Sequence, residues 1–172
     1  RRVNRRLDRL PRFRVSNPLV PRLIQSLVGL TQIGADRRLR RAGIAATDAI
    51  ARSGGHDVRV RVLRPAGDVR AVMLDIHGGA WVLGNARIDD ALNVAMIHAC
   101  GVAIVSVDYR LAPSASVEDM IQDCVAAARW VLNDVSHGLC GLPMFVVGES
   151  AGGHLAAAML LRLKEAPDLF AR

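Results

Sequence analysis

Residues 144–155 read MFVVGESAGGHL. An apolar run leads into the pattern Gly-x-Ser-x-Gly, and a stretch of small residues with a helical pattern follows it. This arrangement is typical of a nucleophile elbow, a sharp turn between a buried strand and a helix that exposes a serine hydroxyl above the edge of a sheet. The flanking Gly148 and Gly152 leave room for a crowded, strained backbone. Ser150 is therefore a candidate nucleophile, and a small-residue turn that only packs a helix on a strand is the alternative.

A second segment of small residues, HGGAW at 77–81, follows the apolar run at 71–76. Consecutive small residues leave backbone N–H groups unshielded. Such donors form oxyanion holes, which stabilise the negatively charged oxygen of a tetrahedral intermediate. A tight glycine turn without a ligand is the alternative. If the strands before the two segments are parallel neighbours, both segments open on the same edge of the sheet, where α/β proteins bind ligands.

The surrounding sequence alternates between strand and helix patterns. Apolar runs at 71–76, 102–107 and 144–147 are typical of parallel strands that are covered on both faces. Helical patterns at 88–99 and 116–134 lie between them. This order predicts an α/β fold with a doubly wound, mostly parallel sheet.

The chain before these strands has a different character. Apolar residues recur at helical spacing through residues 1–53, first at 3–10 and last in a segment at 36–51. Residues 57–64 alternate between apolar and charged, which predicts a strand near a sheet edge with one solvent-exposed face. The sequence thus divides into an N-terminal helical region, 1–53, and an α/β region, 54–172.

Charge is distributed unevenly along the chain. The net charge is +7, yet the first 70 residues hold 17 Arg against five Asp. A basic arm of this kind can contact nucleic acid or anionic lipid. With one aromatic residue in the arm and no nucleic-acid motif, the composition favours a solvated face of an Arg-rich protein instead. We therefore expect no nucleic-acid partner.

The remaining composition bounds the class of protein. The three cysteines are an odd number without metal-ligand spacing, so we expect small buried hydrophobes and no metal site. No apolar stretch reaches the roughly 18–20 residues of a transmembrane segment. The chain starts at Arg1 with no visible secretory signal, which predicts a cytoplasmic location. Nothing in the sequence bears on the oligomeric state.

Three motifs carry a resemblance to a known family. HGGAW at 77–81, DYRLAP at 108–113 and GESAGG at 148–153 occur in this order. The chain resembles the α/β-hydrolases, specifically the hormone-sensitive-lipase-like carboxylesterases, over roughly residues 57–165. The resemblance implies that residues 1–53 form a cap region that shapes the acyl and alcohol pockets. It also implies that residues 54–172 are the N-terminal part of the hydrolase core.

The resemblance also implies roles for individual residues. Ser150 is the nucleophile, and the backbone N–H groups of Gly79, Ala80 and Ala151 are the oxyanion donors, with Gly78 shaping the loop. Ala80 stands where the family usually has a third glycine. Its N–H is kept, so we expect a functional oxyanion hole, with a narrower acyl pocket.

Other residues near the motifs have two interpretations. Trp81 is a candidate pocket residue, and packing under the cap is its alternative. Glu149 is a second candidate pocket residue, although a local hydrogen bond suits it better than a role as an acid. His77 and residues 108–110 are expected to be structural. No metal or organic cofactor is implied.

The catalytic base is missing from the sequence. A serine hydrolase needs a histidine to accept the Ser proton and an acid to orient that histidine, in the order Ser, acid, His in this fold. Only 22 residues follow Ser150, and their one histidine, His154, lies a helical turn further along. Glu165 and Asp168 precede no later histidine. We therefore expect a chain truncated after the nucleophile helix and inactive alone.

Two functions follow from these observations. The complete protein is predicted to be a serine carboxylesterase or lipase-like enzyme that hydrolyses small-molecule carboxylic esters through an acyl-enzyme. An amidase, a deacetylase or a lactonase would use the same groups. The alternative is a non-catalytic hydrolase-like remnant that acts as a binding or interaction module.

Overall fold

The structure is a computed structural model that describes residues 19–165. The helical pattern predicted at 3–10 lies outside these residues. The helices are α2 (Leu19–Thr31), α3 (Ala35–Arg41), α4 (Asp90–Cys100), α5 (Val117–Asn133) and α6 (Ala151–Lys164). The strands are β1 (Ile44–Ser53), β2 (His56–Pro65), β3 (Val72–Ile76), β4 (Ala103–Asp108) and β5 (Met144–Gly148).

The strands form one mixed sheet with the order β1-β2-β4-β3-β5. β3 runs parallel to β4 on one side and to β5 on the other. β2 pairs antiparallel with both β1 and β4. The predicted α/β fold is confirmed, and the parallel strands are the three apolar runs of the sequence. Because β3 and β5 are neighbours, the segments that follow them lie at one edge of the sheet.

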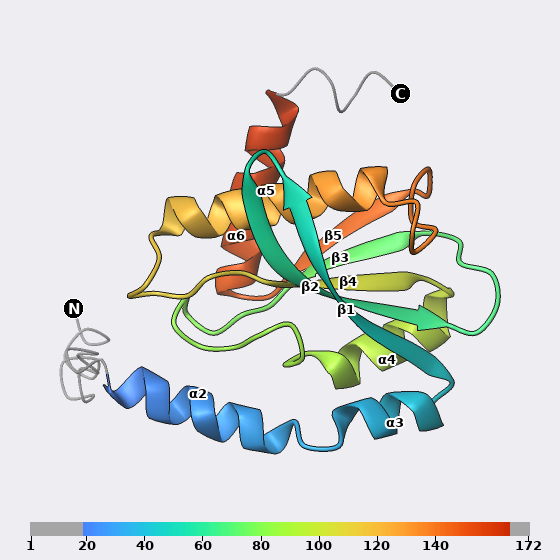
Figure 1. The fold of residues 1–172 in the computed structure, drawn as a ribbon, viewed down its shortest axis with the longest axis horizontal. Coiled ribbons are helices and arrows are strands. Elements are labelled where there is room, and N and C mark those ends of the chain that lie inside the picture. The colour runs from blue at the N-terminus through green and yellow to red at the C-terminus, as the bar shows by residue number, and fades with distance from the viewer. Residues whose placement is uncertain (1–18, 166–172) are drawn as a thin grey trace, which may run out of the picture.

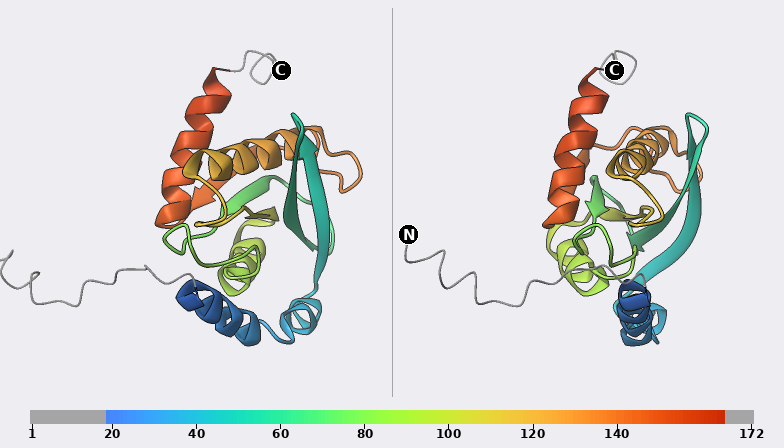
Figure 2. Two further views of the ribbon diagram at one scale, coloured as in Figure 1. Left: turned by 60° about the vertical axis from the view of Figure 1, so that its left-hand side comes forward. Right: turned by 90° about the vertical axis from the view of Figure 1, so that its left-hand side faces the viewer.

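Helices cover both faces of this sheet (Figures 1 and 2). α5 and α6 pack on one face, and α4 lies on the other, with α2 and α3 beyond it. Every residue of β3 is buried, and so are all but the last of β4, which is why these strands are mostly apolar. Two buried clusters, one on each face, hold the layers together.

The helix predicted at 36–51 is wrong over its second half. α3 ends at Arg41, and Gly43 takes a positive φ of 73° before β1 begins. β1 then pairs with β2 over ten residues, from Ile44–Pro65 to Ser53–His56. The alanine-rich segment has helical spacing, but the backbone hydrogen bonds of an antiparallel hairpin override local propensity. Whether residues 1–53 act as a cap stays a prediction.

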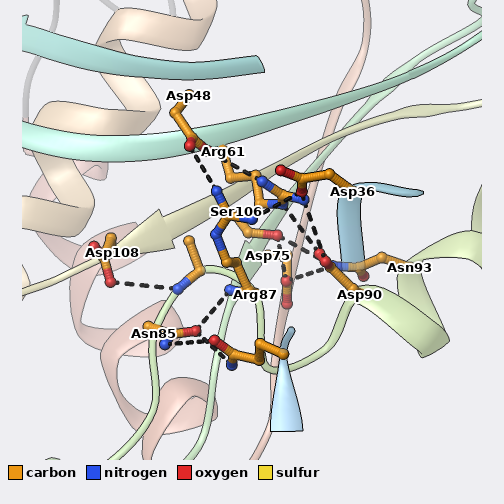
Figure 3. A network of polar contacts seen from close by, with 12 residues as sticks. Asp36, Asp48, Arg61, Asp75, Asn85, Arg87, Asp90, Asn93, Ser106 and Asp108 are labelled. Carbon is orange, nitrogen blue, oxygen red and sulfur yellow. Dashed lines mark hydrogen bonds and ion pairs between the residues drawn. The ribbon is translucent and has the colours of Figure 1, made fainter. Parts of the chain in front are cut away.

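The solvent-exposed face predicted for the strand at 57–64 is wrong at Arg61, which is 1% exposed. Its guanidinium forms ion pairs with Asp36 of α3, Asp48 of β1 and Asp90 of α4. Arg87 forms further pairs with Asp36 and Asp48, so two cations and three carboxylates join four separate segments (Figure 3). A buried arginine is tolerated because it is paired this fully.

A second buried network fixes α4 on the sheet. The carboxylate of Asp75 in β3 accepts hydrogen bonds from the Ser106 hydroxyl of β4 at 2.7 Å and from the Asn93 amide of α4 at 2.8 Å. Asn93 also donates to Ser106.

Among residues 19–165, no helix is both long enough and apolar enough to cross a membrane.

Candidate active site

Ser150 lies between the end of β5 and the start of α6 in a strained turn. Its backbone has φ 52° and ψ −114°, and the residue is exposed. A positive φ is uncommon for any residue other than glycine, and such strain concentrates at functional sites. The sequence predicted this conformation from the local pattern, and the structure has it.

The two glycines of the elbow are required by close contacts. A Cβ atom on Gly148 would lie 2.4 Å from the carbonyl oxygen of Gly152. A Cβ atom on Gly152 would lie 1.8 Å from the carbonyl oxygen of Ile76 in β3. Neither position has room for a side chain. The packing interpretation of the pattern is thus correct for the glycines, and it leaves the hydroxyl of Ser150 exposed.

The glycine-rich loop after β3 lies against this elbow. Ile76 is the register partner of Gly148, so the two loops leave the sheet side by side. A Cβ atom on Gly78 would lie 3.6 Å from the Cβ of Ser150 and 3.0 Å from the carbonyl oxygen of Glu149. The two segments singled out in the sequence therefore meet at the carboxyl edge of the parallel strands.

Three backbone N–H groups of the two loops lack a hydrogen-bond acceptor in the described part of the chain. Those of Gly79, Ala80 and Ala151 donate no hydrogen bond to any acceptor among residues 19–165. Ala151 is the first residue of α6, where unpaired N–H groups and the helix dipole favour negative charge. Ala80 has φ 53°, a left-handed conformation that glycine adopts without strain.

The side chain of His77 is packed against the glycine-rich loop. Its ring is buried, stacks on Tyr109 at 4.3 Å between centroids, and places Nδ1 2.7 Å from the carbonyl oxygen of Gly78. Tyr109 donates its hydroxyl to the carbonyl oxygen of His77 at 2.8 Å. Burial lowers the pKa of His77, so the imidazole is neutral at pH 7. A neutral ring at this position carries its proton on Nδ1 and donates it to Gly78.

The two candidate pocket residues differ in their exposure. Trp81 is partly buried, and its indole meets the ring of His154 edge-on at 5.5 Å. Trp81 Nε1 is buried without a hydrogen-bond partner among residues 19–165. Glu149 is exposed, and its backbone carbonyl accepts the N–H of Gly152 at 2.8 Å.

One carboxyl group beside the site has an unusual pKa. Burial raises the pKa of Asp89 to about 6, and the negative charges of Asp75, Glu149 and Asp90 act in the same direction. Asp89 precedes α4 without capping it through its side chain. No sequence pattern indicated this acidic group, because its neighbours come from β3, α4 and the elbow.

No histidine side chain among residues 19–165 forms a hydrogen bond with Ser150. His154 contacts it through the backbone alone, because the N–H of His154 donates to the carbonyl oxygen of Ser150 at 3.2 Å. His154 is exposed and turns toward Trp81. His137 pairs instead with Asp134 at 3.0 Å. That pair precedes β5, whereas Ser150 follows it, so the five residues of the strand, about 16 Å, separate them.

A parallel-centred α/β sheet with a serine elbow after one strand and a glycine-rich loop after its neighbour defines the class of α/β hydrolases. A family model described as alpha/beta hydrolase fold matches residues 73–170. The chain belongs to this family, and within it the chain is similar to the hormone-sensitive-lipase-like carboxylesterases.

Several of the curated relatives are ester hydrolases by name, and one, from Aspergillus terreus, is named an FAD-linked oxidoreductase. Carboxylesterase NlhH of Mycobacterium tuberculosis is 42% identical over 109 residues, which cover 60% of this chain and 33% of that protein. An arylesterase of Saccharolobus solfataricus is 30% identical over 112 residues, 64% of this chain and 37% of that protein. The neutral cholesterol ester hydrolase 1 of Rattus norvegicus is 36% identical over 115 residues, which cover 59% of this chain and 27% of that protein.

Solved structures show the same relationship. A bacterial heroin esterase superposes with a TM-score of 0.74 at 29% identity, covering 88% of this chain and 48% of that chain. An esterase of Pyrobaculum calidifontis has a TM-score of 0.72 at 26% identity, and the match covers 95% of this chain and 53% of that chain. The chain thus spans about a third of the length of the first two of these curated relatives and about half of these solved chains.

Proposed function

We propose that the natural protein is a serine carboxylesterase that hydrolyses carboxylic esters of small molecules. One observation carries this proposal: the exposed Ser150, in a strained elbow, lies beside a loop in which the N–H groups of Gly79 and Ala80 have no acceptor among residues 19–165. The esterase relatives support it.

The reaction follows from these groups. The hydroxyl oxygen of Ser150 attacks the ester carbonyl carbon, and the carbonyl π electrons move to its oxygen. The N–H groups of Gly79, Ala80 and Ala151 bind this oxyanion in the tetrahedral intermediate. When the intermediate collapses, the alcohol leaves with a proton and the acyl group stays on Ser150. Water then attacks the acyl-enzyme and releases the acid.

The proton needs a base, and no histidine side chain among residues 19–165 forms a hydrogen bond with Ser150. His77 is neutral but buried, with its Nδ1 bound to Gly78, and His154 faces Trp81. We propose that the histidine and its acid belong to a part of the natural protein outside these 172 residues, and that these residues alone are inactive. Trp81 and Glu149 are proposed to border the substrate, and residues 1–53 to act as the cap.

The test uses the protein expressed from its complete natural reading frame. We expect hydrolysis of p-nitrophenyl acetate, and Ser150→Ala should lower kcat by at least about 10⁴-fold because the nucleophile is lost. Ser114→Ala changes an exposed serine away from the elbow and is the matched control. Undiminished turnover in Ser150→Ala would end the proposal. A natural protein that folds but neither hydrolyses esters nor reacts at Ser150 would favour the non-catalytic remnant.

A further inference from the structure

Helix α2 meets the core through polar side chains. Gln25 of α2 and Gln32, which directly follows the last residue of α2, are both partly buried. Leu23, Leu27 and Leu30 are exposed. Glutamine side chains at such a contact indicate specific hydrogen bonding, because an ordinary amphipathic helix turns its apolar stripe inward.

Gln25 binds both peptide groups of Gly84. Its Nε2 donates to the carbonyl oxygen of Gly84 at 2.7 Å, and the N–H of Gly84 donates to its Oε1 at 2.9 Å. The two residues are 59 positions apart in the sequence. Two opposed hydrogen bonds to one residue fix its position and its orientation.

Gly84 in turn lies directly against the ring of His77, which hydrogen-bonds to the glycine-rich loop after β3. Its φ is 104°, and a Cβ atom there would lie 2.5 Å from Nδ1 of His77 and 3.0 Å from the carbonyl oxygen of Gly78. The backbone of Gly84 therefore closes the space around the hydrogen bond from His77 to Gly78. Displacement of Gly84 would give both groups room to move.

The hydrogen bond between His77 and Gly78 sets the direction of an oxyanion donor. Nδ1 of His77 holds the carbonyl of Gly78 at 2.7 Å. In a trans peptide the C=O and the following N–H point in opposite directions. Holding the carbonyl of Gly78 thus fixes the N–H of Gly79, which belongs to the same peptide unit.

Adjacent contacts hold the same segment. Gln32 and Asn85 form a reciprocal pair of amide hydrogen bonds at 2.9 and 3.0 Å. Arg87 donates to Asp36 of α3 at 2.8 Å, within the network of Figure 3. The segment after the oxyanion loop is thus tied to the N-terminal helices at residues 84, 85 and 87.

We propose that Gln25 is a positioning residue for the oxyanion hole. It holds Gly84 against His77 and thereby sets the direction of the N–H of Gly79. The inference rests on the proposed esterase function for its catalytic consequence. The geometric part, that Gln25 protects the bond between His77 and Gly78, can be measured without any turnover.

The catalytic test compares Gln25→Met with wild type in the natural full-length protein. Methionine has a similar length but cannot form the two hydrogen bonds. We expect kcat to fall about tenfold while KM changes less than twofold, because a misdirected donor weakens transition-state binding alone. Gln122→Met is the matched control, because within residues 19–165 the side chain of Gln122 bonds only to Glu118 on α5. It should behave as wild type.

A transition-state analogue separates positioning from general damage. A trifluoromethyl ketone that adds to Ser150 should bind Gln25→Met about tenfold more weakly, in step with kcat, while an unreactive amide analogue binds equally. Gln25→Glu keeps the acceptor for Gly84 and loses the donor, so its kcat should be intermediate. This milder variant decides the question if Gln25→Met does not fold. An unchanged kcat in an active protein, or a loss confined to KM, overturns the proposal.

The structural test is the imidazole Nδ1–H of His77, observed by NMR. In wild type it should exchange slowly with solvent, and in Gln25→Met at least about tenfold faster. Equal exchange rates overturn the proposal whatever the catalytic result. If exchange quickens but the wild type shows no Ser150-dependent hydrolysis, the positioning contact holds and the proposed function fails.

Discussion

Ala80 illustrates how much a single backbone angle decides. At φ 53° a β-branched side chain is strained, whereas glycine is not. We expect Ala80→Val to lower the free energy of unfolding by at least about 1 kcal/mol, and Ala80→Gly to leave it unchanged or raise it slightly. Urea denaturation of both variants measures this. A valine variant as stable as wild type would contradict the left-handed conformation of residue 80.

Asp89 predicts a pH dependence of stability. Its pKa is raised to about 6, above the value of 3.8 that it has when unperturbed, so the folded state binds more protons between these values. The contribution of Asp89 is therefore favourable below about pH 4 and is lost as the pH rises through 6. Asp89→Asn should abolish this fall and be more stable than wild type at pH 8, by about 1–2 kcal/mol.

Thermal unfolding at pH 4 and pH 8 measures the effect of Asp89. Asp57→Asn is the control, because Asp57 is a surface carboxylate paired with the exposed Arg52. A similar pH profile for Asp89→Asn and wild type would show that Asp89 ionises normally.

The residue scale also shows what a sequence can and cannot predict. The strained turn at Ser150 and the glycines on either side of it could be predicted, because the whole elbow lies within five consecutive residues. The burial of Arg61 was not, since its carboxylates come from α3, β1 and α4. Gln25 gave no signal either, because its partner Gly84 lies 59 residues away.

At the scale of elements, Arg61 predicts how the N-terminal segments are held. Arg61→Ala leaves the carboxylate of Asp90 without its partner, and breaking such a buried pair costs about 3–5 kcal/mol. Arg59→Ala, on the same strand but exposed, should stay within about 0.5 kcal/mol of wild type. Equal urea midpoints for the two variants would show that the network contributes nothing.

Strand β5 predicts the behaviour of the 172-residue chain in solution. β5 has one sheet neighbour among the described residues, and Phe145 and Val147 are 58% and 41% exposed. Uncovered apolar edge strands pair with other chains. We expect the 172-residue chain to self-associate, and Phe145→Lys to raise its monomer fraction in sedimentation velocity. A wild-type chain that stays monomeric at high concentration would contradict this.

The prediction of elements succeeded where burial imposes a pattern. The parallel strands β3, β4 and β5 are apolar runs, and α5 has a single apolar stripe, so the sequence showed their type directly. The prediction for residues 44–51 was wrong because β1 is alanine-rich and half exposed. Its pairing with β2, rather than its own sequence pattern, makes it a strand.

At the scale of the whole molecule, the fold explains why distant motifs act together. The elbow and the glycine-rich loop are about 70 residues apart in the sequence, and the parallel pairing of β3 with β5 brings them to one edge. The class of fold was predictable from this order of strands and motifs. The contact of α2 with the loop was not, because it is made by polar side chains without periodic signal.

We have proposed that Ser150 is the nucleophile of an ester-hydrolysing site. Reaction of the natural full-length protein with a fluorophosphonate, followed by peptide mass spectrometry, identifies the nucleophile. We expect one equivalent of adduct, on the peptide that contains Ser150, and loss of ester hydrolysis in proportion to labelling. Adduct formation at another residue, or full hydrolysis with Ser150 unlabelled, would contradict it.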